Sequence, residues 1–316
     1  MTVDNPSIEE MATPAGLSQN PIDVYEWINR RHCALLRTPY EAPDFAGQMM
    51  MVSADLNRLI ESNFDVALFQ TMHRDPSDDA AVHSFGVALI CGALGRRLGM
   101  SADENLRLLA ASLTMNIAML DLQKQLWSQV TPLTNQQRED IQTHPERGRR
   151  WLEALGVNDA EWLRAVQEHH ESPDGTGYPH GIKELSPIAN VIRNIDRYCA
   201  MLGARAYRAP LPANQAARRL YILSETNSDP MPAMIIEAVG IFPPGNYVRL
   251  TNGELAIVTH RGEQAHTPQV VSLTNGRGDV LPEPVPRDTT RAEFSVSELL
   301  PPETVNVRID PKKVFS

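Results

Sequence analysis

Three features are scarce in this sequence of 316 residues, and each scarcity excludes a class of protein. Cysteine occurs only three times, at distant positions and without CxxC spacing, so we expect no disulfide framework. No apolar run approaches the roughly 18 residues that a membrane helix needs. No basic-then-apolar start marks a signal peptide. We therefore expect a soluble, cytoplasmic protein that does not associate with membranes.

Positive charge is also in short supply. Lysine and arginine number 29 against 39 aspartates and glutamates, which gives a formal net charge of −10. An excess of negative charge argues against broad contact with nucleic acid or with an anionic membrane surface. A small anionic ligand is still compatible with this charge wherever basic residues gather locally. The hydrophobic content of 42% is ordinary for a globular protein with a sizeable core.

Apolar spacing divides the chain into a helical part and a small β part. Asn252-Gly253 separates two segments of alternating pattern, which is typical of a β-hairpin, and residues 269–274 form a third predicted strand. The expected fold is mainly α, a helical bundle followed by a small C-terminal β element. Helices are predicted for residues 21–37, 45–72, 80–98, 103–127, 134–155, 158–170, 186–202, 213–225 and 230–239.

These elements suggest a division of the chain into five parts. Residues 1–20 lack periodicity and are expected to form a flexible arm. Helices in residues 21–75 are expected to pack on a helical domain over residues 76–239. A small β extension over residues 240–290 and a Pro- and charge-rich tail over residues 291–316 complete the chain.

The most informative stretch runs from His169 to Pro179. Two adjacent histidines and Glu171 end a predicted helix, and a loop with two glycines and a closing proline follows. Because adjacent helical residues point about 100° apart, His169 and His170 reach one site only at a helix end. The combination predicts metal ligands beside a backbone that can approach a ligand closely. A polar helix end followed by a turn is the alternative.

Other residues with metal-binding or phosphate-binding chemistry lie on neighbouring helices. His144 falls on the inward face of its helix beside Gly148, so it is either a ligand or a hydrogen-bonded core histidine. Asp196 lies on an apolar stripe and needs a partner, which is an arginine or a metal ion. Arg205 and Arg208 suit a phosphate group, or else are solvated arginines at a helix end.

Residues 169–179 resemble the signature of HD-GYP domains, a subgroup of the HD superfamily of metal-dependent phosphohydrolases. The family pattern is HHE, a short gap and DG-x-GYP, and this chain reads HHESPDGTGYP. The resemblance extends over about residues 79–208. It implies an HD-domain-like bundle with more than one metal ion, usually iron or manganese, that hydrolyses cyclic di-GMP. It also implies that His83, His144, His169, His170 and Asp196 bind metal, and that Gly177, Tyr178, Pro179, Arg205 and Arg208 bind substrate.

The chain departs from this family at the pair that gives it its name. The family has a His-Asp pair within HD-x-GK, and the matching stretch here begins Met115-Asn116 and ends at Met119. Asparagine is a neutral, weaker ligand than aspartate, and a thioether is a poor match for iron or manganese. We therefore expect one divalent ion, iron or manganese, or none, and we assign no residue a catalytic role.

Three functions follow from these residues. The favoured hypothesis is an HD-GYP-like signalling protein with weak or no phosphodiesterase activity, which binds cyclic di-GMP, a related nucleotide or a partner protein. An active metal-dependent cyclic di-GMP phosphodiesterase with a reduced metal site is the first alternative. A protein-interaction scaffold without nucleotide binding is the second. Neither nucleic acid nor a membrane is an expected partner.

Overall fold

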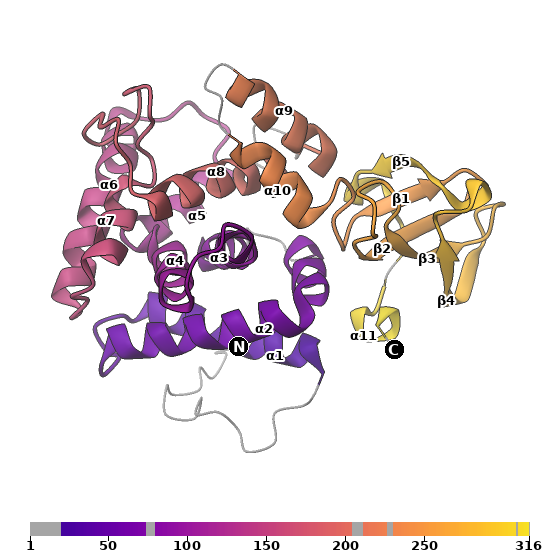
Figure 1. Ribbon diagram of the computed structural model, residues 1–316, viewed down its shortest axis with the longest axis horizontal. Coiled ribbons are helices and arrows are strands. Elements are labelled where there is room, and N and C mark those ends of the chain that lie inside the picture. The colour runs from indigo at the N-terminus through magenta and orange to yellow at the C-terminus, as the bar shows by residue number, and fades with distance from the viewer. Residues whose placement is uncertain (1–19, 74–79, 204–210, 226–229, 308, 316) are drawn as a thin grey trace. The chain divides into compact units, whose positions relative to one another are not determined.

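The computed structural model describes residues 20–73, 80–203, 211–225, 230–307 and 309–315 (Figure 1). Helices α1 to α10 come first along the chain and strands β1 to β5 follow, in agreement with a mainly α fold that ends in a small β element. The chain divides into two compact units. The first comprises Met1–Ser62 and Pro76–Arg193, and the second comprises Asn63–Asp75 and Asn194–Ser316. Across the described residues, every helix is too short or too polar to span a bilayer.

The first unit is helical. One of its helices, α2, bends at Asn63, where φ is −149° and ψ is 45°, and the boundary between the two units falls at this bend. The helices that contribute to the first unit, wholly or in part, are α1 (Pro21–Arg37), α2 (Phe45–His73), α3 (Ala80–Arg97), α4 (Ala102–Thr114), α5 (Leu120–Ser128), α6 (Asn135–Ala154), α7 (Ala160–Glu168) and α8 (Pro187–Leu202).

Helix α3 lies at the centre of the first unit, packed against α1, α4 and α5 (Figure 1). It is apolar around most of its circumference, as expected of a helix that is buried on all sides. Gly92 allows its neighbours to approach closely, because an added Cβ would lie 2.6 Å from Ile60 Cδ1 and 2.8 Å from Leu109 Cδ2. The sequence of α3 is therefore suited to the interior of a bundle.

The structure corrects one predicted helix. Instead of a single helix over residues 103–127, the chain forms α4, a 3-10 turn η2 (Ile117–Met119) and α5. The chain turns because Asn116 (φ −104°, ψ 14°) and Met119 (φ −136°, ψ 17°) leave helical geometry. Apolar residues continue at helical spacing through the turn, so periodicity alone does not reveal it. A capping box of Thr134 and Gln137 begins α6.

The second unit contains α9 (Ala213–Glu225), α10 (Met231–Val239), α11 (Pro311–Val314) and an antiparallel sheet in the order β4-β3-β2-β1-β5. The predicted hairpin at Asn252-Gly253 is confirmed, with Gly253 at a φ of 89°. Two strands were not predicted, and one of them lies within residues 291–316, where it pairs with β1. The strands are β1 (Tyr247–Leu250), β2 (Leu255–His260), β3 (Gln269–Thr274), β4 (Val280–Asp288) and β5 (Val296–Leu300).

A half-buried histidine lies at the end of α2 in the second unit. The ring of His73 lies beside the rings of Phe69 and Tyr247, with centroid separations of 4.6 and 5.5 Å. It also hydrogen-bonds the backbone of Gly245. Because burial penalises the charged imidazolium, the pKa of His73 is lowered from 6.5 to about 4.

The stability of the fold should therefore fall in mild acid. Between pH 6.5 and about 4, the unfolded chain binds a proton at residue 73 that the folded chain does not. The free energy of unfolding is unaffected above this window, decreases as the pH falls through it, and should lose about 2 kcal/mol by about pH 5. Denaturant titrations above this window and at about pH 5 should show that His73→Phe removes this loss of stability. The same pH dependence in the variant and the wild type would contradict the assignment.

Candidate metal centre

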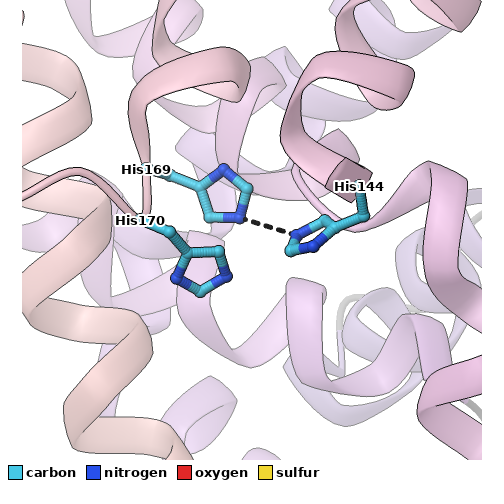
Figure 2. A group of neighbouring side chains, drawn as sticks. All are labelled: His144, His169 and His170. Carbon is cyan, nitrogen blue, oxygen red and sulfur yellow. Dashed lines mark hydrogen bonds between the residues drawn. The ribbon is translucent and has the colours of Figure 1, made fainter. Parts of the chain in front are cut away.

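Three histidines from two helices converge on one point in the first unit. His144 comes from α6, whereas His169 and His170 follow the last residue of α7 (Figure 2). Each of the three offers a ring nitrogen, and these atoms all lie within 4.8 Å of one another. His144 and His169 are fully buried, and His170 is half-buried. Three of the predicted ligands are thus brought together.

In two of these rings, a hydrogen bond to a backbone carbonyl determines which of the two ring nitrogens carries hydrogen. Nδ1 of His144 lies 2.7 Å from the carbonyl oxygen of Ile141, and Nδ1 of His169 lies 2.6 Å from that of Val166. A carbonyl oxygen only accepts hydrogen bonds, so each Nδ1 must be the donor. In the neutral rings each Nε2 then carries a lone pair, which is the form that binds a metal ion.

The two Nε2 atoms face each other. They are 3.2 Å apart, which is a hydrogen-bonding distance (Figure 2). A hydrogen bond between them would need one N–H donor, but in the neutral tautomers both nitrogens carry a lone pair and neither carries hydrogen. A cation between them resolves this conflict. Two nitrogens bound to one ion at about 2.1 Å lie about 3.0 to 3.4 Å apart, so the observed spacing fits a shared ion. The third imidazole, of His170, completes a set of neutral nitrogen ligands suited to iron, zinc or related ions.

The sequence makes both carbonyls available for this role. Inside a helix, the carbonyl of Ile141 would accept from the backbone N–H of residue 145, but that residue is a proline and has none. The carbonyl of Val166 lies in the last turn of α7, where the final carbonyls have no partner within the helix. In each case a carbonyl that the helix leaves unpaired accepts a hydrogen bond from the histidine three residues later.

Pro145 should therefore position His144. In Pro145→Ala, a new backbone N–H competes for the carbonyl of Ile141, and the imidazole is held less firmly. We expect Mn²⁺ affinity to fall about tenfold by titration calorimetry, at the lower end of the range for groups that orient a ligand. The free energy of unfolding should not fall, because alanine suits a helix interior better than proline. The exposed change Gln142→Ala on the same helix is the control, and unchanged affinity in Pro145→Ala would rule out this role.

The loop after the histidines is held by a buried carboxylate. Glu171 is fully buried, and its two oxygens accept hydrogen bonds from the backbone N–H groups of His180 (2.7 Å) and Ile182 (3.1 Å). The backbone N–H of Tyr178 donates to the carbonyl of His170 (3.2 Å), and the two rings stack with centroids 4.7 Å apart. Glu171 therefore maintains the loop conformation that places Tyr178 against the metal centre.

The exposed tip of the loop is stabilised by its own side chains. The carboxylate of Asp174 accepts hydrogen bonds from the backbone N–H and the hydroxyl of Thr176, and these lower the pKa of Asp174 to about 2. Gly175 has a φ of 80°, a conformation that favours glycine. Asp174 thus shapes the turn.

Not all of the predicted ligands and substrate residues belong to this group. His83 lies half-buried on α3, and Asp196 lies buried on α8 in the second unit. The group of described residues that can share one ion contains neither of them. Gly177, Tyr178 and Pro179 form the loop beside His170, and the Tyr178–Pro179 peptide is cis. Arg205 and Arg208 lie outside the described residues.

Sequence reasoning missed the residues that orient the centre. Pro145 could have been found, because a proline within a helical pattern leaves one carbonyl without its usual donor. The role of Glu171 depends on backbone groups up to eleven residues away, and no local pattern reveals it. The same holds for Arg193 of α8, which donates to the hydroxyl of Ser172 (3.0 Å).

The altered stretch, residues 115–119, departs from the family pattern, and its backbone at Met115 lies close to α6. An added Cβ on Gly148 of α6 would lie 3.8 Å from the carbonyl oxygen of Met115 and 3.4 Å from Cγ1 of Val166 on α7. Met115 and Asn116 are both buried.

Comparison with known proteins agrees with this site. The model of the HD domain family matches residues 56–230, more than half of the chain. The chain is 29% identical to Cyclic di-GMP phosphodiesterase PA4108 of Pseudomonas aeruginosa over 70% of its own length and 54% of that protein. It is also 29% identical to the 3'3'-cGAMP-specific phosphodiesterase 3 of Vibrio cholerae, over 43% of its own length and 30% of that protein. The chain thus spans about half or less of these curated relatives.

A solved structure shares the fold. Bd1817, a HDG"Y"P protein from Bdellovibrio bacteriovorus, matches with a TM-score of 0.57 and 16% identity, over 73% of this chain and 75% of that chain. At this identity the likeness concerns the fold alone. The family match spans the three histidines and the loop that follows them, and the resemblance of residues 169–179 to HD-GYP domains is confirmed. The chain belongs to the HD domain family.

Proposed function

We propose that this chain holds one divalent metal ion between His144, His169 and His170, binds a cyclic dinucleotide of the cyclic di-GMP class, and hydrolyses it weakly or not at all. The observation that carries the proposal is the opposition of two Nε2 lone pairs at 3.2 Å, with a third imidazole beside them. The nucleotide class is suggested by the two relatives, whose names state that they cleave cyclic di-GMP and 3'3'-cGAMP.

The chain's own residues would orient the ligand. The ring of Tyr178, stacked on His170, provides an aromatic surface beside the metal centre on which a nucleobase can stack. Glu171 keeps this ring in place through the backbone of the loop. A bound divalent ion would supply Lewis-acid polarisation of a phosphate oxygen and a water molecule of lowered pKa.

Weak hydrolysis is proposed because positions 115 and 116 do not supply the charged ligand that the family resemblance implies for a second ion. An imidazole brings no negative charge to a metal ion, and Met115 and Asn116 supply a thioether and an amide where the family resemblance implies a histidine and an aspartate. Hard divalent ions prefer carboxylate oxygens to either group. With one ion, only part of the charge that develops on the phosphodiester would be neutralised.

One observation favours an active enzyme with a reduced site. The amide oxygen of Asn116 is buried and has no hydrogen-bond partner within the described part of the chain. A buried acceptor without a partner is costly, so this oxygen could serve as a neutral ligand to the same ion. Under this second hypothesis, an ion held by three imidazoles and one amide would support slow hydrolysis.

Restoring the two altered side chains tests the proposal. The double variant Met115→His with Asn116→Asp should hydrolyse cyclic di-GMP at least about tenfold faster than the wild type in the presence of Mn²⁺, because it restores a charged metal ligand. Chromatography of the nucleotide products measures the rate, and calorimetry measures binding to the wild type.

The controls separate the hypotheses. The single variant Met115→Leu, which keeps the position apolar, should leave the rate unchanged. Ready hydrolysis by the wild type that His170→Ala abolishes would establish the active enzyme instead. Failure of the wild type to bind either cyclic di-GMP or 3'3'-cGAMP would refute the nucleotide part of the proposal.

A further inference from the structure

A cavity of about 660 Å³ opens in the first unit. Its walls come from the end of α1 and the turn after it, the start of α3, η2 with α5, and one face of α6. None of the metal-centre histidines lines it, and neither does Tyr178. Its volume lies within the range of about 300 to 1,000 Å³ that small-molecule sites occupy. The floor is apolar and includes Ile117, Ala118 and Met119 of the altered stretch.

The charge of the lining contrasts with the rest of the chain. Three cationic side chains, Arg37, Lys124 and Arg147, face two carboxylates, Asp121 and Asp140. The lining thus carries one more positive than negative charge, whereas the whole chain has a net charge of −10. Such a local excess attracts anions.

One carboxylate of the lining is already engaged. Arg147 forms an ion pair with Asp140 at 3.2 Å, and its other terminal nitrogen donates to the carbonyl of Ala118 at 3.2 Å. These contacts hold the guanidinium against the floor. Lys124 is exposed at the opening, where it can meet a ligand's negative group.

Two aromatic side chains also line the cavity and are exposed to solvent. Tyr40 is 66% exposed and Trp151 is 37% exposed, and both are among the large apolar side chains that the fold leaves uncovered. Exposed aromatic rings at the opening of a cavity provide flat surfaces on which planar groups stack. An inorganic anion would leave these rings unused.

We propose that this cavity binds a small organic anion with a planar aromatic ring, of the nucleoside monophosphate class. The ring stacks on Trp151 and Tyr40, and the phosphate is bound by Lys124 and Arg37. This site is separate from the metal centre and does not rest on the proposed function. On α6, Asp140, Arg147 and Trp151 line the cavity, whereas His144 meets His169.

Binding can be tested without metal. AMP and GMP are titrated into the His170→Ala protein in EDTA, with saturation-transfer NMR to detect contact and calorimetry to measure affinity. We expect at least one nucleotide to bind with a Kd below about 1 mM. The matching nucleoside, which lacks the anion, and inorganic phosphate, which lacks the ring, should each bind at least about fivefold more weakly. No saturable binding of either nucleotide would overturn the proposal.

Substitutions in the lining locate the site. Trp151→Ala and Lys124→Ala should each weaken binding at least about fivefold, whereas Trp151→Phe and Lys124→Arg should retain most of it. Arg150→Ala, on the same helix but outside the lining, is the matched control and should leave affinity within about twofold. Because the replaced side chains are exposed, the variants should fold, which circular dichroism verifies. Nucleotide binding that neither alanine variant weakens would place the ligand elsewhere.

Discussion

Replacement of His169 by alanine is expected to weaken the binding of Mn²⁺ by at least about 100-fold, since removing a direct ligand exceeds the effect of removing a group that orients one. The substitution removes one Nε2 of the pair that is 3.2 Å apart. Titration calorimetry of protein freed of metal should give one site per chain for the wild type. Co²⁺ can replace Mn²⁺, because its visible absorption bands report the ligand set directly.

The control for this measurement is a histidine of the other unit. His266 is exposed in the second unit, so His266→Ala should leave the affinity within about twofold. An unchanged affinity in His169→Ala would show that the ion binds elsewhere in the chain. In His83→Ala, a loss as large as that in His169→Ala would add His83 to the ligands, as the family resemblance implies.

A large loss of local stability is expected when Gly177 is replaced by alanine. An added Cβ would lie 2.4 Å from both the Cα of Glu171 and the backbone nitrogen of Ser172. These are backbone atoms, so no side-chain rotation relieves the overlap and the loop must move. We expect a cost of about 3 kcal/mol, of the order known for steric strain at buried positions.

Hydrogen exchange measures this effect where it arises. The amides of His180 and Ile182 donate to Glu171 in the closed loop, so their protection should fall by about 100-fold in Gly177→Ala. Mn²⁺ affinity should fall as well, because Tyr178 no longer supports His170. Gly148→Ala is the matched control, since its added Cβ would be 3.4 Å from the nearest atom. Unaltered protection in Gly177→Ala would mean that the loop tolerates the side chain.

Much of the helical part follows from local chemistry. The α1 and α6 helices begin where a polar cap and a proline or capping box precede an apolar stripe, and both signals are short-range. The turn at Asn116 could not be predicted, because apolar residues continue on both sides of it. It depends on how α4, η2 and α6 pack together.

The two outer strands were missed for a different reason. β4 contains prolines at positions 282, 284 and 286 and has only partly buried or exposed residues. Prolines are tolerated there because an edge strand does not need every backbone N–H. β5 is short and equally exposed, so neither strand has the apolar alternation that marks β1 to β3. Their pairing is a property of the assembled sheet.

The three clustered histidines were predicted because a specific motif and helical spacing agree on them. Their protonation was not predicted. It depends on carbonyl distances of 2.7 and 2.6 Å, which no sequence pattern contains. The grouping of His83 and Asp196 with these histidines stays a prediction, because it was inferred from the family resemblance alone.

The proline after His144 has a consequence for how this centre can change through evolution. Part of the orientation of His144 and His169 comes from backbone carbonyls within α6 and α7. Side-chain substitutions elsewhere, including those at positions 115 and 116, leave these two carbonyl acceptors in place. A lineage that lost catalysis would keep a preformed pair of imidazoles, and a lineage that regained it would not need to rebuild them.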